Sequence, residues 1–177
     1  MKKAIINLIL ILMAFVIYFL QSDFFSWFNI SGVMPNLFVI FVLFIGLFAN
    51  KTMGAIYGMA VGLILDFAIG SKVGIYAVGL GLIGFLAGAL DKNFSKDSRI
   101  TIMVMVFVAT VVFEIFYYVL NYIFLSINVE IVNFIILLVI EVIYNLILTI
   151  IIYPLLQKFG YYIENEYKGN KILTRYF

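Results

Sequence analysis

The stretch of this sequence that most constrains the fold reads GAIYGMAVGLILD and covers residues 54–66. Its glycines recur every four residues, at Gly54, Gly58 and Gly62, and Asp66 continues the same row. Residues four apart lie close together on one side of an α-helix, and glycines in such a row let a second helix approach until the two backbones touch. The stretch therefore predicts a helix that packs closely against a neighbour and carries an acid near its end.

A second row of small residues follows the first, and ten of the thirteen glycines of the chain lie between Gly46 and Gly88. Its members are spaced alternately three and four apart, as in a helix with a near-parallel neighbour; they are Gly74, Ala77, Gly81, Gly84 and Gly88. Two interpretations stay open. Both rows pack against other helices of this chain, which is the commoner use of such rows, or one of them receives the transmembrane helix of a partner.

The chain as a whole is too apolar to fold in water. Of its 177 residues 66% are hydrophobic and 11% are charged, which leaves too little polar surface to cover a water-soluble globule. A helix needs about 20 mainly apolar residues to cross the hydrocarbon core of a bilayer. Six stretches qualify, and they predict an all-α, polytopic membrane protein forming a single integral membrane domain over residues 1–177: residues 4–20, 33–49, 52–69, 73–90, 100–125 and 131–156.

The basic residues predict the orientation of these six spans. With both termini in the cytoplasm, only Lys72 lies outside and the ten other Lys and Arg residues lie inside, as the positive-inside rule requires. The second stretch is short and contains Pro35, so a re-entrant segment is the alternative there, but it would leave three basic residues inside and eight outside. We therefore expect six crossings and a cytoplasmic tail, residues 157–177, at the headgroup level. The ten residues are Lys2, Lys3, Lys51, Lys92, Lys96, Arg99, Lys158, Lys168, Lys171 and Arg175.

Three acidic residues lie within the apolar stretches, where an unpaired charge is costly. Asp66 either caps or tethers the turn into the next helix, or it contacts a partner. Glu114 and Glu141 each begin a polar face that continues to Asn121 and Asn145, respectively. We expect these two faces to meet in a hydrogen-bonded seam. A proton or ion pathway, and a groove for a partner helix or a lipid, are the alternatives.

The residue types needed for most enzymatic chemistry are missing. The chain has no Cys and no His, which excludes thiol nucleophiles, disulfides and thiolate or imidazole metal sites. Its glycines lie inside apolar helices, without the strand and the Lys of a phosphate-binding loop. The formal net charge of +2 is concentrated on the face that meets anionic lipid. We therefore expect a protein of the lipid bilayer that is not an enzyme, with no cofactor, no metal ion and no nucleic acid partner.

A series of short motifs runs through most of the chain. Pro35-Asn36-Leu37 precedes an apolar run, and the row of glycines ends in the segment Gly62-Leu63-Ile64-Leu65-Asp66. Further along the chain are Gly70, Gly74-Ile75-Tyr76, Gly84, Gly88 and Tyr153-Pro154-Leu155-Leu156. With these motifs, its length and its six apolar stretches, the chain resembles the rod shape-determining protein MreD family of bacteria. The Gly-Leu-x-x-Asp segment is the most distinctive part of the resemblance.

The resemblance implies a non-enzymatic scaffold of the cell-elongation machinery in the bacterial cytoplasmic (inner) membrane. Such a protein binds the single-pass protein MreC and couples the MreB cytoskeleton, with the RodA and penicillin-binding synthase pair, to lateral peptidoglycan synthesis and cell shape. The resemblance also implies the fold of the S components of energy-coupling-factor transporters. The alternative function is therefore a substrate-binding S subunit of a vitamin transporter. Against it, the first stretch lacks an Ala-x-x-x-Ala face, and the external loops carry few polar groups.

Overall fold

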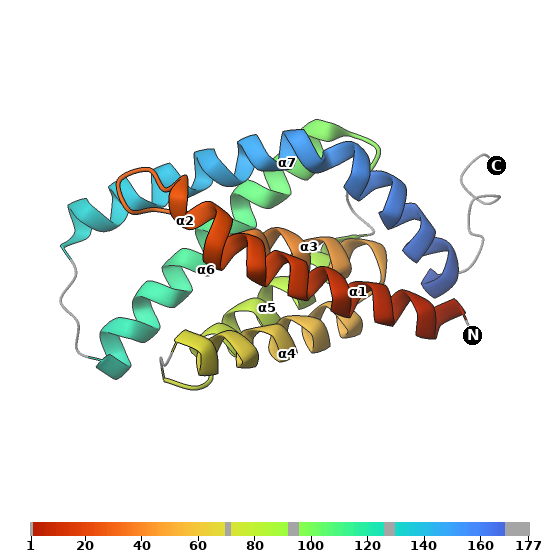
Figure 1. Cartoon of the computed structure of the whole chain (residues 1–177), viewed down its shortest axis with the longest axis horizontal. Coiled ribbons are helices and arrows are strands. Elements are labelled where there is room, and N and C mark those ends of the chain that lie inside the picture. The colour runs from red at the N-terminus through yellow and green to blue at the C-terminus, as the bar shows by residue number, and fades with distance from the viewer. Residues whose placement is uncertain (1, 70–71, 92–95, 126–129, 169–177) are drawn as a thin grey trace.

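The structure is a computed structural model of the chain, and it describes residues 2–69, 72–91, 96–125 and 130–168. The described part is an elongated helical bundle in which six main helices run alternately between two ends (Figure 1). A π-helical turn, η1 (Leu20–Phe24), and a short helix, α2 (Phe25–Trp27), continue the first helix. The main helices are α1 (Lys2–Phe19), α3 (Leu37–Phe48), α4 (Lys51–Ile69), α5 (Ile75–Leu90), α6 (Arg99–Leu125) and α7 (Ile131–Lys168).

Helix α3 is the core of the bundle. All of its twelve residues are buried, and it contacts α1, α4, α5, α6 and α7. A helix that is apolar on every side, as α3 is, is typical of a position enclosed by other helices. The bundle is therefore organised around one central helix.

The predicted span of residues 33–49 is wrong in its bounds, because the helix that forms is shorter. The helix begins only at Leu37, because Pro35 has no amide hydrogen to donate and the Asn36 side chain caps the first turn by accepting a hydrogen bond from the Val39 amide at 3.2 Å. It ends at Phe48. Its 12 residues reach about 18 Å, which is less than the hydrocarbon thickness of a bilayer.

Among the described residues four helical segments are long and apolar enough to cross a membrane, whereas α3 and α5 are shorter apolar helices. The four are Lys2–Trp27, Lys51–Ile69, Arg99–Phe124 and Ile131–Lys168. Helix α1 starts before the expected span 4–20 and is extended by η1 and α2, and α4 and α6 each begin one residue before the expected spans 52–69 and 100–125. Helix α5 begins two residues after the expected start of span 73–90, for a reason given below.

Helix α7 corrects the prediction for the end of the chain. The helix does not stop at residue 156 but continues to Lys168, so residues 157–168 are helical rather than irregular. Pro154 lies inside the helix, where it removes one backbone hydrogen bond and permits a bend. Beyond the bend α7 turns toward the N-terminus (Figure 1), and the fully buried Ile163 anchors it. Residues 169–177 lie outside the described residues.

The two ends of the bundle differ in charge. The start of α1 and the last turns of α7 lie at the same end (Figure 1), where Lys2 forms a 3.3 Å ion pair with Glu166. We call this the basic end; its described basic residues are Lys2, Lys3, Lys51, Lys96, Arg99, Lys158 and Lys168. Lys72 lies at the opposite end, where it donates to the carbonyl oxygen of Phe124. Lys92, Lys171 and Arg175 lie outside the described residues.

Candidate functional site

The glycine row of α4 faces α5. Gly54, Gly58 and Gly62 are buried, and a Cβ atom on Gly58 would lie 2.6 Å from the carbonyl carbon of Leu80 and 2.8 Å from the amide nitrogen of Gly81. Cβ atoms do not approach other atoms that closely, so only glycine allows this spacing. The first row therefore sets the separation of α4 and α5.

The second row closes the same interface from the side of α5 and adds α3 to it. A Cβ atom on Gly84 would lie 2.8 Å from the side chain of Val42 in α3, and one on Gly46 would lie 2.8 Å from Ala87 in α5. Gly88 approaches the backbone at the start of α4 in the same way. Close packing of three helices follows from the two rows together.

Gly81 lies in the same interface, but it faces a flexible side chain rather than helix backbone. The nearest atom to a Cβ on Gly81 would be the side-chain Cγ of Met59, at 2.7 Å, and a flexible side chain can move away where backbone cannot. The rows thus face each other inside the chain. This packing leaves a partner's helix no access to Gly54, Gly58 or Gly62.

Gly74 and Asp66 both serve the start of α5. The prediction that Gly74 belongs to the packing row is wrong, because Gly74 precedes the helix and has a left-handed φ of 113°, which glycine adopts without strain. Asp66 is fully buried, and its carboxylate accepts hydrogen bonds from the amides of Gly74 (2.8 Å), Tyr76 (3.0 Å) and Ala77 (3.2 Å). A carboxylate at a helix N-terminus satisfies donors that have no partner within the helix. Asp66 therefore caps α5.

A cluster of polar side chains inside the bundle surrounds the N-terminus of α3. Asn145 of α7 is fully buried; it accepts from the Asn36 amide at 2.8 Å and donates to the Thr110 hydroxyl of α6 at 3.0 Å. Gln21 accepts from the Leu37 amide at 3.1 Å. A helix can begin away from water only if its first amides find such acceptors. Asn145 thus joins α3, α6 and α7 at one point.

Glu114 and Glu141 lie beside this cluster, one turn along α6 and α7. The structure brings the two carboxyl groups together in a hydrogen bond, and Glu141 also interacts with Asn36 and Asn145. One carboxyl oxygen of Glu141, Oε1, is buried without a hydrogen-bond partner. Asn121 donates to the Tyr117 carbonyl of its own helix at 2.8 Å. Three of the four predicted intramembrane polar residues therefore lie together, and Asn121 is apart from them.

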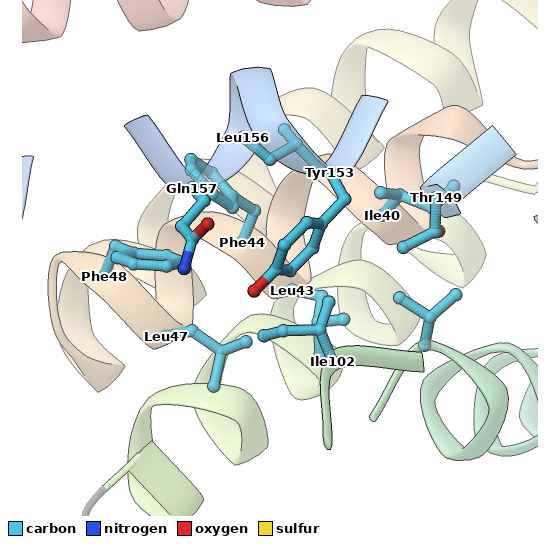
Figure 2. A pocket seen from close by; sticks show the side chains of 11 residues that line it. Ile40, Leu43, Phe44, Leu47, Phe48, Ile102, Thr149, Tyr153, Leu156 and Gln157 are labelled. Atoms are coloured by element: carbon cyan, nitrogen blue, oxygen red, sulfur yellow. The ribbon is translucent and has the colours of Figure 1, made fainter. Parts of the chain in front are cut away.

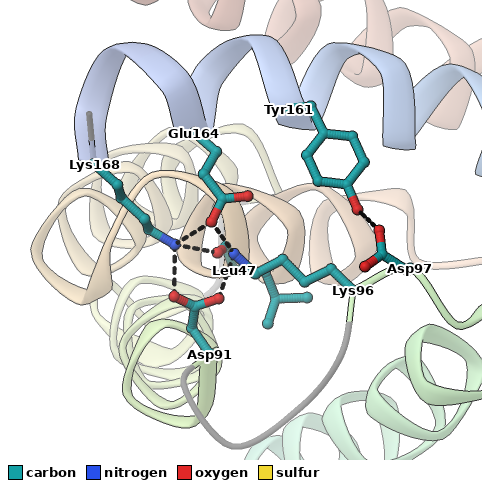
Figure 3. A network of polar contacts seen from close by, with 7 residues as sticks. All are labelled: Leu47, Asp91, Lys96, Asp97, Tyr161, Glu164 and Lys168. Carbon is teal, nitrogen blue, oxygen red and sulfur yellow. Dashed lines mark hydrogen bonds and ion pairs between the residues drawn. The ribbon is translucent and has the colours of Figure 1, made fainter. Parts of the chain in front are cut away.

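A second charged cluster, at the basic end, was not expected from the sequence. Lys96 lies 2.5 Å from Asp91 and 2.6 Å from Glu164, and Lys168 lies 2.6 Å from Asp91. Lys168 also donates to the Leu47 carbonyl oxygen, at 2.7 Å, and so caps the C-terminus of α3 (Figure 3). We call these four charged residues the ion cluster. It ties both ends of the α5–α6 connection to the last turns of α7.

The surroundings of the ion cluster keep its charges paired. Burial lowers the pKa of Lys96, but hydrogen bonds to Asp91 and Glu164 outweigh that effect and the pKa is raised above its ordinary value. The Lys96 side chain is only 8% exposed. Breaking such a buried pair is strongly destabilising because one charge stays behind without a partner. The ion cluster therefore holds the last turns of α7 in position.

A small cavity between α3, α6 and α7 offers no room for a substrate. Tyr153 and Gln157 of α7 point into it, together with Leu47 of α3 (Figure 2). Its volume of about 10 Å³ is at the lower limit of what can hold one water molecule. In the part of the chain that the structure describes, no three His, Cys, Asp or Glu side chains are grouped so that they could hold a metal ion.

The family model for the rod shape-determining protein MreD matches residues 2–163. The chain belongs to the MreD family. The match includes both glycine rows, Asp66, the polar cluster at the start of α3 and α7 as far as Ile163. No curated protein and no solved structure matches the chain. Membership gives this protein a role in rod-shape determination, within a family of structural rather than enzymatic proteins, and its apolar helices make it a multi-pass membrane protein.

The residues of the ion cluster escaped the sequence analysis for a simple reason. Lys96 and Lys168 stand in the sequence as basic flanks of the expected spans, and no sequence pattern links them to Asp91 or links Lys96 to Glu164. One signal was present, because Glu164 and Lys168 are four residues apart and lie 3.6 Å from each other on one helix face. Their contact with Asp91, far away in the sequence, could not be inferred from that spacing.

Proposed function

We propose that this member of the MreD family is a non-enzymatic membrane scaffold of the bacterial cell-elongation machinery. It binds the single-pass protein MreC in the cytoplasmic membrane and couples MreB, with the RodA and penicillin-binding synthase pair, to lateral peptidoglycan synthesis. The observation that carries this proposal is the family match over residues 2–163. The packing supports it, because the two glycine rows hold α3, α4 and α5 tightly together, as expected of a rigid scaffold.

The proposed topology has six crossings with both termini in the cytoplasm. Two features support it: the six main helices alternate in direction (Figure 1), and seven described basic residues lie at one end while Lys72 lies at the other. A 12-residue α3 is compatible with it, because the capped ends of α3 lie within protein rather than in lipid. The arrangement we propose resembles that of S components of energy-coupling-factor transporters.

The partner's helix is proposed to contact an exposed face of the bundle, because the glycine rows already pack against other helices of this chain. Helix α1 is one such face: Ile6 and Leu10 are its only buried residues in the described range, and large apolar side chains such as Phe15 (68% exposed) and Phe19 (65% exposed) point outward. Lipid or a partner helix of similar polarity can cover them.

Depletion and replacement test the function. In a rod-shaped bacterium depleted of its own MreD, this chain should restore rod shape and should copurify MreC in mild detergent. Depletion of the chain from its own cells, followed by measurement of vitamin uptake, is the companion experiment, because the transporter alternative predicts a loss of uptake with normal shape there. Cells that stay rounded despite normal insertion of the chain, with no MreC recovered, would contradict the proposal.

Glu114 and Glu141 are proposed to form a structural seam between α6 and α7. Two Gln side chains can replace two carboxyl groups that share a hydrogen bond, so a variant with Glu114→Gln and Glu141→Gln should still support rod shape. The measurement is cell shape together with recovery of MreC. Lost shape with full recovery of MreC would instead favour an ion pathway through these residues.

A further inference from the structure

A patch of exposed apolar side chains lies at the end of the bundle opposite the basic end, where η1 and α2 continue α1 (Figure 1). We call it the aromatic patch; its residues are Phe24, Trp27, Phe28 and Ile30, and all four are exposed. Trp27 is the most exposed of them, at 88%. Residues 24–34 contain no charged residue. A contiguous apolar surface of this kind marks a contact with something other than water.

The length of the first helical segment determines the level of the patch in a bilayer. Lys2, at the basic end, and Trp27 are the first and last residues of one helical segment, Lys2–Trp27. Trp27 comes 25 residues after Lys2, which corresponds to about 37 Å along the helix. The hydrocarbon core is about 30 Å thick, and a tilt of about 20° shortens the projected length by only about 2 Å. With Lys2 among the headgroups of one leaflet, Trp27 therefore reaches the headgroups of the other, and the charged Asp23 stays out of the core.

The polar groups around the patch are hydrogen-bonded within the segment itself. The side chain of Asn29 donates to the Ser26 carbonyl at 2.6 Å and accepts from the Gly32 amide at 3.1 Å. Ile30 and Val33 exchange two backbone hydrogen bonds, at 3.0 Å and 2.9 Å. A protein–protein interface carries about one hydrogen bond per 100–200 Å², whereas the apolar part of a bilayer requires backbone groups to be satisfied internally. These internal hydrogen bonds favour lipid over a protein partner.

Phe25 and Tyr144 hold the segment so that the patch faces outward. Phe25 is buried, its ring meets that of Tyr144 in α7 edge-on at 6.3 Å, and the Tyr144 hydroxyl donates to the Phe28 carbonyl. Trp27 follows Phe25 by two residues, so its side chain points to the opposite side of the helix. An indole ring has an apolar body and one N–H donor, and it is enriched where acyl chains meet headgroups.

We propose that the aromatic patch is a lipid anchor, which lies among the headgroups and the first acyl carbons of the leaflet opposite the basic end. The inference depends neither on MreC nor on the direction in which the chain inserts. The described buried residues of α1 are Ile6 and Leu10, both in the half near the basic end. The anchor holds the other half at the level where Gln21 accepts from the Leu37 amide and caps α3.

The chain contains one Trp, so its fluorescence reports on Trp27 in the unaltered protein. The whole chain is reconstituted in phosphatidylcholine vesicles in which part of the lipid carries bromine, a quencher, either near the headgroup or near the end of the acyl chain. Both leaflets contain the quencher, so the direction of insertion does not matter. Shallow bromine should quench Trp27 several-fold more strongly than deep bromine. Iodide in the buffer should quench it less than it quenches free tryptophan.

A variant with Trp27→Phe and Phe15→Trp is the matched control. Position 15 lies on the same helix and is also well exposed, at 68% for Phe15. It is 12 residues, or about 18 Å, closer to the basic end, near the middle of the bilayer. In this variant deep bromine should be the stronger quencher. Thermal unfolding in detergent first confirms that the variant folds as the wild type does, and the wild-type measurement decides the matter without it.

Three results would overturn the proposal. Iodide quenching as strong as that of free tryptophan, with none from brominated lipid, would place the aromatic patch in water. Deep bromine quenching the wild-type protein as strongly as shallow bromine would place Trp27 in the hydrocarbon core. Cross-links from a photoreactive residue at position 27 to a protein, rather than to lipid, in whole membranes would assign the patch to a partner.

Discussion

Replacing Gly58 by Ala should separate α4 from α5. The added Cβ atom would lie 2.6 Å from the carbonyl carbon of Leu80 and 2.8 Å from the amide nitrogen of Gly81. Carbon atoms in comfortable contact are about 3.5–4.0 Å apart, so the helices must move apart by about 1 Å. Because both obstructing atoms belong to a helix backbone, no rotamer change can relieve the contact.

The expected cost follows from two opposing effects. Overpacking of this kind destabilises a protein by about 1–3 kcal/mol, whereas Gly→Ala in a helix by itself stabilises by about 1 kcal/mol. With rigid backbone on both sides we expect the upper half of the overpacking range and a net loss of about 1–2 kcal/mol. For a chain of this size the loss corresponds to a fall of a few degrees in the unfolding midpoint.

Gly81→Ala is the matched control in the same interface. It adds the same methyl group, but the group meets the flexible side chain of Met59 at 2.7 Å, so the helix-propensity gain should offset the packing cost. Thermal unfolding of both variants in one detergent, followed by circular dichroism, gives the comparison. If Gly58→Ala proved no less stable than Gly81→Ala, backbone contact between α4 and α5 would not be the reason for glycine in this row.

Three further changes test other parts of the structure. Asp66→Ala should lower stability by about 1–3 kcal/mol in thermal unfolding, because three amides at the start of α5 lose their acceptor, and Asp66→Asn should lower it less, since one oxygen remains; equal losses would argue against a capping role. Lys96→Met should leave Asp91 and Glu164 to share Lys168 as their cation within the ion cluster, and should speed amide hydrogen exchange in residues 157–168 at a cost of about 1–3 kcal/mol; unchanged exchange would show that the ion cluster does not hold α7 in place. In this cysteine-free chain a membrane-impermeant maleimide should label Ser22→Cys in intact cells and Lys158→Cys only after permeabilisation, and the reverse pattern would invert the proposed topology.

Much of the helix pattern could be read from the sequence, because it depends on local composition. Apolar runs predicted the positions of α4 and α6 to within one residue at their starts. The errors lie at the ends of helices, where a single capping or breaking residue determines the boundary. Asn36 begins α3 later than hydropathy alone suggests, and the left-handed Gly74 delays α5. Helix α7 passed its expected end because an amphipathic helix can continue beyond an apolar span if it packs on protein.

The candidate sites show the same division. The four-residue repeat at Gly54, Gly58 and Gly62 indicated close packing, but only the structure identifies α5 as the neighbour. Glu114 and Glu141 were recognisable as costly residues, and their shared hydrogen bond depends on how α6 crosses α7. The ion cluster was not recognisable at all, since it is made by segments that are distant in sequence.

The sequence by itself determined the solvent of this protein, its helical class, the glycine rows and the family resemblance, because hydrophobicity and residue spacing are properties of neighbouring residues along the chain. Only the tertiary structure decided that a 12-residue helix forms the core, with side chains from other helices capping both of its ends. That decision depends on contacts between distant residues. A short helix in the centre is stable only when α1, α4, α5, α6 and α7 enclose it and satisfy its terminal amides and carbonyls.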